Sequence, residues 1–443
     1  MISFRTAGSG SGAPYASAKL ALLCAILGSA WAARSIFNPL LDLAKADLAI
    51  SDMHVGLVQG IALSLPAALL SIPVGRMIDT RNRMLLLVGL AAATMLGSVA
   101  TALASSFTDL FVYRGLTGLG IMEEAVVLSL AADLFPPERR GRVTALIILA
   151  EYFGNALGFV FAGWLLPVAS FMPLFTGAGE WRMAPLLFGL AGLLLALPLL
   201  WMQEPPRRET MPGTGAASLA KGFVALNAFG RLLWPLLVAQ VATIMAGNMA
   251  SVWAVPVLAR DFGLGEAEGG QLVAAILLVP PLLGALAAGI LADRGSGRGG
   301  AMLIAAAASL LALPGAAFPV VDSVHVSAAL LALLVAGQTA ALLGASAISI
   351  LVLPNDIRGL WFGISGVMTM AFGFALAPSL APWLVAGTGG ELSSALAWIL
   401  FALRHLRGDR FHIGATAECC RGRRRPRAFF LAALIFPSAQ LEI

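Results

Sequence analysis

Several ionisable side chains lie inside long apolar runs, where a charge is costly and is therefore a candidate for function. The arginines are Arg34 and Arg114, and the acids are Glu123, Glu124 and Glu151. An arginine presents a planar fork of donors that suits a phosphate or a carboxylate. A partly desolvated carboxylate can take up and release a proton near neutral pH. These residue types predict anion recognition and proton transfer in an apolar setting.

The composition indicates that this setting is a membrane. Hydrophobic residues make up 59% of the chain and charged residues only 12%, whereas about a quarter of a soluble chain is charged. The runs between charges reach the roughly 20 residues that a spanning helix needs. They do not alternate as the strands of a transmembrane barrel would. The net charge of +5 does not predict a nucleic-acid partner, because the basic residues fall in short loops where they set topology.

Apolar segments and loop charges together predict an all-α topology. Arginines cluster in alternate loops, as at 76–83, 139–142 and 207–208, which predicts that these loops and both termini are cytoplasmic. We expect the protein in the plasma membrane, as a bacterial inner-membrane protein. The predicted spans are 18–41, 53–74, 84–105, 109–133, 143–168, 182–202, 231–258, 269–292, 300–320, 326–353, 359–386 and a short one at 392–403.

These spans predict the organisation of the chain. We expect a cytoplasmic N-terminal tail at 1–17, a six-helix bundle at 18–202, a cytoplasmic linker at 203–230, a second bundle at 231–403 and a basic cytoplasmic tail at 404–443. The twelfth span has about half of the length that crossing requires. After it the composition shifts abruptly to arginine. The tail either binds lipid headgroups or reflects a shifted reading frame.

Two short signals occur once in each half of the chain. Residues 75–79 (Gly-Arg-Met-Ile-Asp) correspond to 289–294 (Gly-Ile-Leu-Ala-Asp-Arg). Residues 136–141 (Pro-Pro-Glu-Arg-Arg-Gly) correspond to 354–359 (Pro-Asn-Asp-Ile-Arg-Gly). The two halves are therefore predicted to be the same bundle, repeated. Two such bundles around a midplane cavity are what alternating access requires, so the pattern predicts a carrier.

The chain resembles the major facilitator superfamily from about residue 18 to about residue 390. The family signature after the second span reads Gly-x-x-x-Asp-Arg/Lys-x-Gly-Arg/Lys-Arg/Lys, and Gly75, Asp79 and Arg83 match it. Arg114 is followed by Gly118 and Gly120 in another family pattern. The resemblance implies a twelve-helix fold of two six-helix pseudo-repeats. It also implies that acids and arginines at the cytoplasmic ends latch the two bundles together in the outward-open state.

Within that superfamily, the segments 133–141, 181–182 and 204–207 are similar to the spinster-like branch. Members of this branch are proton-linked carriers of lysolipids, sphingoid lipids or other amphiphiles. The branch usually has an acid before the arginine of the first span, where this chain has Ala33, and a glutamate directly after the Gly-x-Gly of the fourth span, where it has Ile121.

Helical rise predicts the depth of the buried charges. At about 1.5 Å per residue, Arg34 lies roughly 22 Å from the cytoplasmic start of its span and Arg114 roughly 7–8 Å from the outer end of its own. The two arginines are therefore expected at one level, where they could share an anion. For Arg114 the alternative is a structural role in binding backbone carbonyls. Glu124 and Glu151 each lie roughly 13–14 Å from the inner surface, which makes them candidate proton carriers, with packing roles as the alternative. Glu123 points away from Arg114, so a packing role is favoured for it.

These considerations define two candidate sites. Neutral polar groups of the second half are expected to supply shape and hydrogen bonds to the first. The predicted substrate and coupling cavity comprises Arg34, Asn38, Arg114, Glu124, Glu151, Gln240, Asn248 and Gln338. The predicted cytoplasmic gate comprises Gly75, Asp79, Arg83, Asp133, Arg140, Asp293 and Arg294.

The sequence thus predicts a secondary transporter of a small organic or amphiphilic solute, anionic or lysolipid-like, that works by alternating access with protons as the coupling ion. We expect a monomer that contacts membrane lipids and needs no cofactor, and no Gly-x-x-x-x-Gly-Lys-Ser/Thr loop for ATP occurs. The first alternative is a membrane sensor that kept the fold and lost transport. The second is a lipid-modifying enzyme, against which no nucleophile–base pair or metal cluster is found.

Overall fold

The computed structural model describes residues 12–169, 177–207, 223–294 and 307–403, and within these ranges every regular element is a helix. Among these described residues, ten helices are long and apolar enough to cross a membrane, and two shorter apolar helices lie at Ala307–Val320 and Leu392–Leu403. The predicted all-α fold is therefore confirmed. The start of the ninth predicted span, most of the linker and the whole tail after Leu403 lie outside the described residues.

The first half of the chain contributes six consecutive helical spans, several of them interrupted by short 3-10 or π segments. In chain order the elements are α1 Gly12–Ser35, η1 Asn38–Leu40, α2 Leu41–Asp47, α3 Asp52–Leu57, η2 Val58–Ala62, α4 Leu63–Thr80, α5 Arg83–Ala102, α6 Phe107–Gly118, η3 Leu119–Met122, α7 Glu123–Leu134, α8 Pro137–Ala169, η4 Gly177–Arg182, α9 Met183–Ala196 and η5 Leu197–Trp201.

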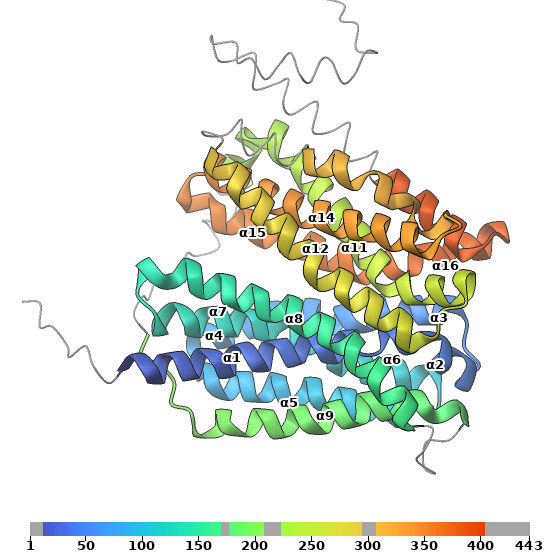
Figure 1. Ribbon diagram of the computed structural model, residues 1–443. Helices are drawn as coiled ribbons and strands as arrows, with labels where there is room; N and C mark the ends of the chain where they lie inside the picture. The colour runs from blue at the N-terminus through green and yellow to red at the C-terminus, as the bar shows by residue number, and fades with distance from the viewer. Residues whose placement is uncertain (1–11, 170–176, 208–222, 295–306, 404–443) are drawn as a thin grey trace, which may run out of the picture.

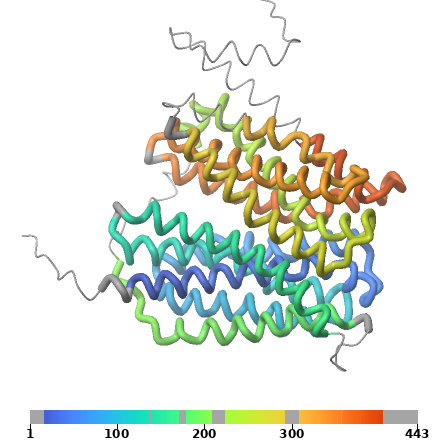
Figure 2. Tube along the Cα trace, in the orientation of Figure 1, coloured from blue at the N-terminus to red at the C-terminus, as the bar shows by residue number. Residues whose placement is uncertain are grey.

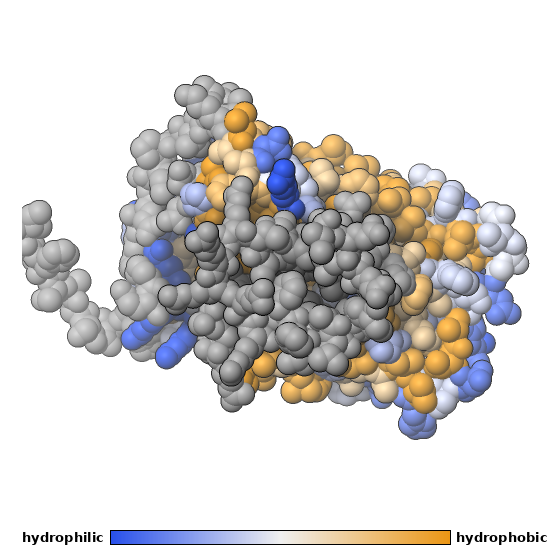
Figure 3. All heavy atoms as spheres, turned by 90° about the horizontal axis from the view of Figure 1, so that it is seen from above, coloured by the Kyte–Doolittle hydropathy of each residue, from blue (hydrophilic) through white to orange (hydrophobic). Residues whose placement is uncertain are grey.

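Among the described residues, the second half contributes four long helical spans and the two shorter apolar helices. Its elements are α11 Gly230–Phe262, α12 Glu266–Arg294, η6 Pro314–Val320, α14 Val324–Val352, α15 Asn355–Met368, η7 Thr369–Leu376 and α16 Ala377–Thr388. Figures 1 and 2 show the elements α1 to α9 as one bundle and α11 to α16 as a second bundle packed beside it. Exposed apolar side chains such as Leu69, Leu194, Leu286 and Trp398 cover the flanks of the helices, and Figure 3 shows orange hydrophobic surface between bluer helix ends. Such a belt suits contact with lipid tails.

The molecule has two distinct ends. We call the end that carries 76–83, 139–142 and 203–207 the arginine-rich end, and the end that carries 47–52 and 262–266 the opposite end. At the opposite end, the two bundles share one apolar core that contains Phe37 and Phe159 of the first and Trp253 of the second. Toward the arginine-rich end the cores are separate: one cluster is built from 20–199 alone, and smaller ones are built from the second half alone. The bundles therefore adhere at the opposite end.

Ion pairs add to the contact between the bundles at the opposite end. Arg260, in the last turn of α11, donates to the carboxylates of Asp42 in α2 and Asp52 in α3, the latter at 2.8 Å. Lys45 of α2 also reaches Asp52, at 2.7 Å. These side chains retain 23–33% exposure, so the cluster lies at the surface rather than in the core.

Some helices are broken where they face the middle of the molecule. The first span stops being α-helical after Ser35 and resumes as the 3-10 segment η1, which has a proline at its start. The π segments η2 and η7 interrupt the second and eleventh spans. A break frees backbone carbonyls, which hydrocarbon cannot satisfy. In the second bundle, side chains of α11 satisfy them: Trp253 donates to the Pro378 carbonyl at 2.9 Å and Asn248 to the Gly373 carbonyl at 3.1 Å.

Asp47 joins three spans at the opposite end. Its Oδ2 accepts from the indole N–H of Trp181 at 3.0 Å and from Arg182 at 2.7 Å. Arg182 also donates to the carbonyls of Ala102 and Ala104, at 2.9 and 2.6 Å. One carboxylate thus fixes the start of the sixth span against the ends of the first and third.

We expect Asp47→Ala to destabilise the first bundle by about 2–3 kcal/mol, because it leaves a half-buried guanidinium and an indole N–H without their acceptor. The measurement is the thermal unfolding midpoint of the purified protein in detergent. Asp322→Ala is the matched control, since Asp322 is an exposed loop residue for which no pairing is found in the described ranges. Equal midpoints for the two variants would show that this contact does not hold the spans together.

Candidate functional site

A cavity of about 310 Å³ lies between the two bundles, next to the helix breaks. Its volume is at the lower end of the range for small-molecule sites, roughly 300–1,000 Å³. The first, second and fifth spans line it from one bundle, and the seventh, eighth, tenth and eleventh line it from the other. The polar lining residues are Trp31, Arg34, Ser35, Asn38, Gln59, Glu151, Tyr152, Asn155, Asn248, Ser251, Gln338 and Thr339.

Arg34 lines the cavity and forms no ion pair with any of the described residues. Its side chain is buried, with 8% exposure, and its Nη1 has no hydrogen-bond partner in the part of the chain that is described. The guanidinium carbon lies 5.4 Å from the ring centre of Trp31 and 5.9 Å from that of Phe374. Aromatic faces stabilise a cation without consuming its N–H groups. Arg34 therefore keeps donors available to a ligand.

Arg114 lies behind the cavity wall, and its hydrogen bonds are made with the protein. It is fully buried and donates to the carbonyl of Ala33 at 3.2 Å and to that of Arg34 at 2.7 Å. It also donates to Oε1 of Gln59 at 2.9 Å, and Gln59 in turn donates to Oδ1 of Asn38. These carbonyls are the ones freed where α1 ends. Arg114 is thus a structural brace for the broken first span, and it does not share an anion with Arg34 in this structure.

The buried acids occupy three different environments. Glu151 lines the cavity from α8, and its Oε1 has no partner among the described residues. Glu124 of α7 interacts electrostatically with Glu151 but does not line the cavity. Glu123 is fully buried inside the first bundle, with its Oε1 3.1 Å from the Thr94 hydroxyl. Glu151 is therefore the acid that a solute can reach, and Glu124 is its neighbour.

The second bundle contributes neutral polar groups, as the sequence predicts. Asn248 and Gln338 line the cavity, whereas Gln240 does not. Asn248 uses its N–H₂ group on the carbonyls of η7. The Gln338 amide packs directly against Gly247 of α11, where any side chain would collide with it. The oxygen of this amide has no partner in the ranges that the structure covers.

Sequence reasoning missed several lining residues. Gln59 is a polar residue within the second span, so its burial could have been suspected from the composition of that span. Trp31 and Phe374 look like ordinary apolar positions, and only the cavity distinguishes them from the many lipid-facing aromatics. Tyr152 of α8 interacts with Thr339 of α14 across the two bundles, a pairing that depends on how the bundles dock.

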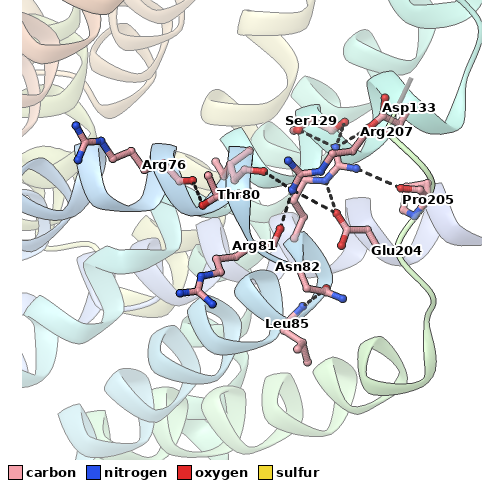
Figure 4. Close-up of polar contacts among 12 residues, drawn as sticks. Arg76, Thr80, Arg81, Asn82, Leu85, Ser129, Asp133, Glu204, Pro205 and Arg207 are labelled. Atoms are coloured by element: carbon pink, nitrogen blue, oxygen red, sulfur yellow. Dashed lines mark hydrogen bonds and ion pairs between the residues drawn. The ribbon is translucent and has the colours of Figure 1, made fainter. Parts of the chain in front are cut away.

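Two predicted gate residues of the first bundle, Arg83 and Asp133, meet at the arginine-rich end, and Figure 4 shows Asp133 with Ser129 and Glu204 in this cluster. Arg83, the first residue of α5, donates to Asp133 at 2.6 Å and to Glu204 at 2.7 Å. It also donates to the hydroxyl of Ser129 at 3.0 Å. Its side chain is 4% exposed, so this is a nearly buried ionic cluster. Arg207 adds hydrogen bonds to the carbonyl of Ile78 in the last turn of α4 and to that of Arg81 just after α4.

The other predicted gate residues differ in their surroundings. Asp79 is exposed and forms no ion pair with any residue that the structure describes. A side chain on Gly75 would meet no atom within 4 Å. Arg140 lies partly exposed in the first turns of α8. Asp293 and Arg294 end α12, and their side chains lie outside the described residues.

The family model described as Major Facilitator Superfamily matches residues 23–254. The uncharacterized transporter YgaY of Escherichia coli O157:H7 is 29% identical over 196 residues, which are 43% of this chain and 46% of that protein. Protein spinster homolog 1 of Mus musculus is 29% identical over 179 residues, 39% of this chain and 31% of that protein. The match thus spans less than half the length of each relative.

A solved structure is similar over almost the whole chain. It is the crystal structure of a bacterial homolog of the human lysosomal transporter Spinster, in an inward-facing and unoccupied conformation. The TM-score is 0.70 at 20% identity, covering 98% of this chain and 100% of the other. The matched family and the matched relatives are transporters rather than enzymes. This finding removes the alternative of a lipid-modifying enzyme.

The two buried arginines predict opposite effects on stability. Arg34→Met should raise the thermal unfolding midpoint, because a buried guanidinium without an ionic partner costs several kcal/mol. Arg114→Met should lower the free energy of unfolding by about 3 kcal/mol or more, because it leaves carbonyls and Gln59 unsatisfied. Thermal unfolding in detergent measures both. A fall of similar size in the two variants would contradict the assignment of Arg34 to ligand binding and Arg114 to the scaffold.

Proposed function

Because the chain belongs to the major facilitator superfamily, we propose that it is a secondary transporter that moves a small organic solute by alternating access. The solute binds in the cavity between the bundles. The arginine-rich end faces the cytoplasm, since arginines accumulate in cytoplasmic loops. The single observation that carries the proposal is the unequal contact of the bundles: they adhere at one end of the cavity and have separate cores at the other.

Glycines at the two ends support two alternating contacts. At the opposite end, a Cβ on Gly56 would lie 2.9 Å from the carbonyl oxygen of Pro378, and Gly60 packs against the carbonyl of Ala375. At the arginine-rich end, Gly75 and its counterpart in the repeat, Gly289, have open space where a side chain would stand. The glycines at the opposite end thus lie in close contact with the other bundle, whereas those at the arginine-rich end do not. Closing the arginine-rich end and opening the opposite end would exchange their roles.

The present arrangement corresponds to the inward-facing state in this proposal. The similar Spinster homolog was solved in an inward-facing conformation. The exposure of Asp79 is consistent with it, since a latch at the arginine-rich end has to be open when the cavity faces that side. The ion pairs of Arg260 with Asp42 and Asp52 then close the outer side.

Proton coupling is assigned to the Glu124–Glu151 pair. Two neighbouring carboxylates in a low-dielectric region do not both ionise readily, so such a pair holds and releases a proton. Glu151 reaches the cavity and Glu124 lies behind it. Solute and proton are therefore coupled through one pair of acids. The neighbouring Glu123 is enclosed in the first bundle and takes no part.

A matched pair of glycine substitutions tests alternating access. Gly60→Leu should prevent closure of the opposite end and favour the outward-open state, whereas Gly75→Leu should keep the arginine-rich end open. The readout is labelling of Ser251→Cys in the cavity by a membrane-impermeant thiol reagent, in vesicles of either orientation, with the native cysteines replaced by serine. We expect at least threefold more labelling from the outside in Gly60→Leu and none of that change in Gly75→Leu.

Asp322→Cys, in an exposed loop near the opposite end, reports the orientation of the vesicles. Identical labelling of Ser251→Cys in both glycine variants, on both sides, would contradict alternating access. It would favour a sensor that holds one conformation.

The proton pair is tested by Glu124→Gln. This variant should lose solute accumulation driven by a pH gradient, by tenfold or more, because the pair no longer holds an exchangeable proton. Exchange of solute across proteoliposomes without a gradient should continue, because Glu151 still lines the cavity. Glu268→Gln, at an exposed acid in α12, is the control. Full pH-driven accumulation in Glu124→Gln would contradict proton coupling through this pair.

A further inference from the structure

We propose that the cavity selects a compact zwitterion, with the anionic group of the solute at Arg34 and Trp31 and the cationic group at Glu151 and Gln338. The proposal rests on the function proposed above and names the class of solute. It follows from four residues that line the cavity, each of which has a buried polar atom without a partner in the described ranges.

One side of the cavity supplies unsatisfied donors. Nη1 of Arg34 and Nε1 of Trp31 both lack a hydrogen-bond partner among the described residues. Both residues belong to α1 and are three positions apart, so they lie on one face of the helix. The positive charge of Arg34 and these N–H groups suit a carboxylate or another small anion.

Another side supplies unsatisfied acceptors. Oε1 of Glu151 on α8 and Oε1 of Gln338 on α14 both lack a partner in the described chain. Because α8 belongs to the first bundle and α14 to the second, a single cationic group between them would touch both bundles. Gly247 leaves the space that the Gln338 amide occupies, so this glycine positions the neutral acceptor. An ammonium group has the donors and the charge that these oxygens need.

Helix register separates the two groups along the membrane normal. Ser35 donates to the carbonyl of Asn155 at 2.8 Å. A Cβ placed on Gly28 would lie 3.0 Å from the carbonyl oxygen of Ala150. These pairs put Glu151 level with residues 29–31 of α1, so it lies about three to five residues, or about 5–8 Å, nearer the arginine-rich end than Arg34. Arg34 and Glu151 form no ion pair with each other in the described structure.

Leaving opposite charges apart in one cavity is costly unless something joins them. A solute with its own opposite charges at its two ends would satisfy both and leave the cavity electrically balanced. The cavity volume of about 310 Å³ limits that solute to a compact molecule. A simple anion would leave Glu151 uncompensated, and a simple cation would leave Arg34 uncompensated.

Three probes of equal chain length test the proposal by calorimetric titration of the purified full-length protein: 6-aminohexanoate, hexanoate and hexylamine. We expect 6-aminohexanoate to bind at least tenfold more tightly than either singly charged analogue. Arg34→Gln should reduce its affinity to that of hexylamine, and Glu151→Gln should reduce it to that of hexanoate. Glu268→Gln, at an exposed acid, should keep the tenfold preference. The shorter 4-aminobutanoate and the longer 8-aminooctanoate test the spacing.

Each outcome bears on the proposal. Hexanoate or hexylamine binding as tightly as the zwitterion would overturn it, as would a tenfold preference that survives Glu151→Gln. The proposal would also be overturned if 4-aminobutanoate, 6-aminohexanoate and 8-aminooctanoate all failed to bind more tightly than their singly charged analogues. The binding measurement does not require transport. If the protein prefers the zwitterion but fails the labelling test, the result counts against alternating access and leaves the proposed zwitterion site intact.

Discussion

The structure depends on one constraint: a broken helix inside hydrocarbon needs a partner for every carbonyl it frees. Arg114 meets this need in the first bundle, where it donates to the carbonyls of Ala33 and Arg34. Through Gln59 it also connects to Asn38, just beyond the break. The second bundle meets the same need with Asn248 and Trp253. Because these donors are in place, the first and eleventh spans can bend beside the cavity, and polar side chains can face its interior. Without them the spans would have to remain continuous helices.

Position beside the cavity separates scaffold from site among the buried charged residues. Arg114 and Arg34 are both buried arginines of the first bundle, and each has one nitrogen without a partner in the described chain, Nε of Arg114 and Nη1 of Arg34. Arg114 makes three hydrogen bonds with the protein, whereas Arg34 lines the cavity. Glu123 and Glu151 each have one carboxylate oxygen without a partner in the described chain, but Glu123 is enclosed near Thr94 and Glu151 lines the cavity. A costly buried polar atom on a residue that lines a cavity is best explained by a ligand that binds there.

Much of the fold could be predicted from the sequence, and less of the site. The positions of the spans follow from the lengths of the apolar segments. The repeat follows from the similarity of residues 75–79 to residues 289–294. Both signals can be read from short stretches of the chain. Depth along each helix could also be estimated, and Arg34 and Glu151, both predicted to lie well inside their spans, line the cavity in the structure. The rotation of each helix about its own axis could not be estimated in this way. That rotation decides that Glu124 lies behind Glu151 and that Gln240 lies away from the cavity. The depth argument put Arg34 and Arg114 at one level, and they are adjacent, but only the break in α1 shows that Arg114 is used by the backbone. The pairing of Tyr152 with Thr339 depends on docking of the two bundles, which no local pattern encodes.

The ionic contacts at the two ends of the molecule differ in their exposure to solvent. Asp42, Asp52 and Arg260 remain about a quarter exposed, whereas Arg83 is almost enclosed by Asp133 and Glu204. Mobile ions screen exposed charges over about 8–10 Å at physiological strength and hardly affect enclosed ones. In the proposed transport cycle, the contact that holds the bundles together at the outer side is therefore weakened by external salt, whereas the Arg83 cluster within the first bundle is not. A cell in brackish surroundings would then hold more of the molecule with this contact open than a cell in fresh water.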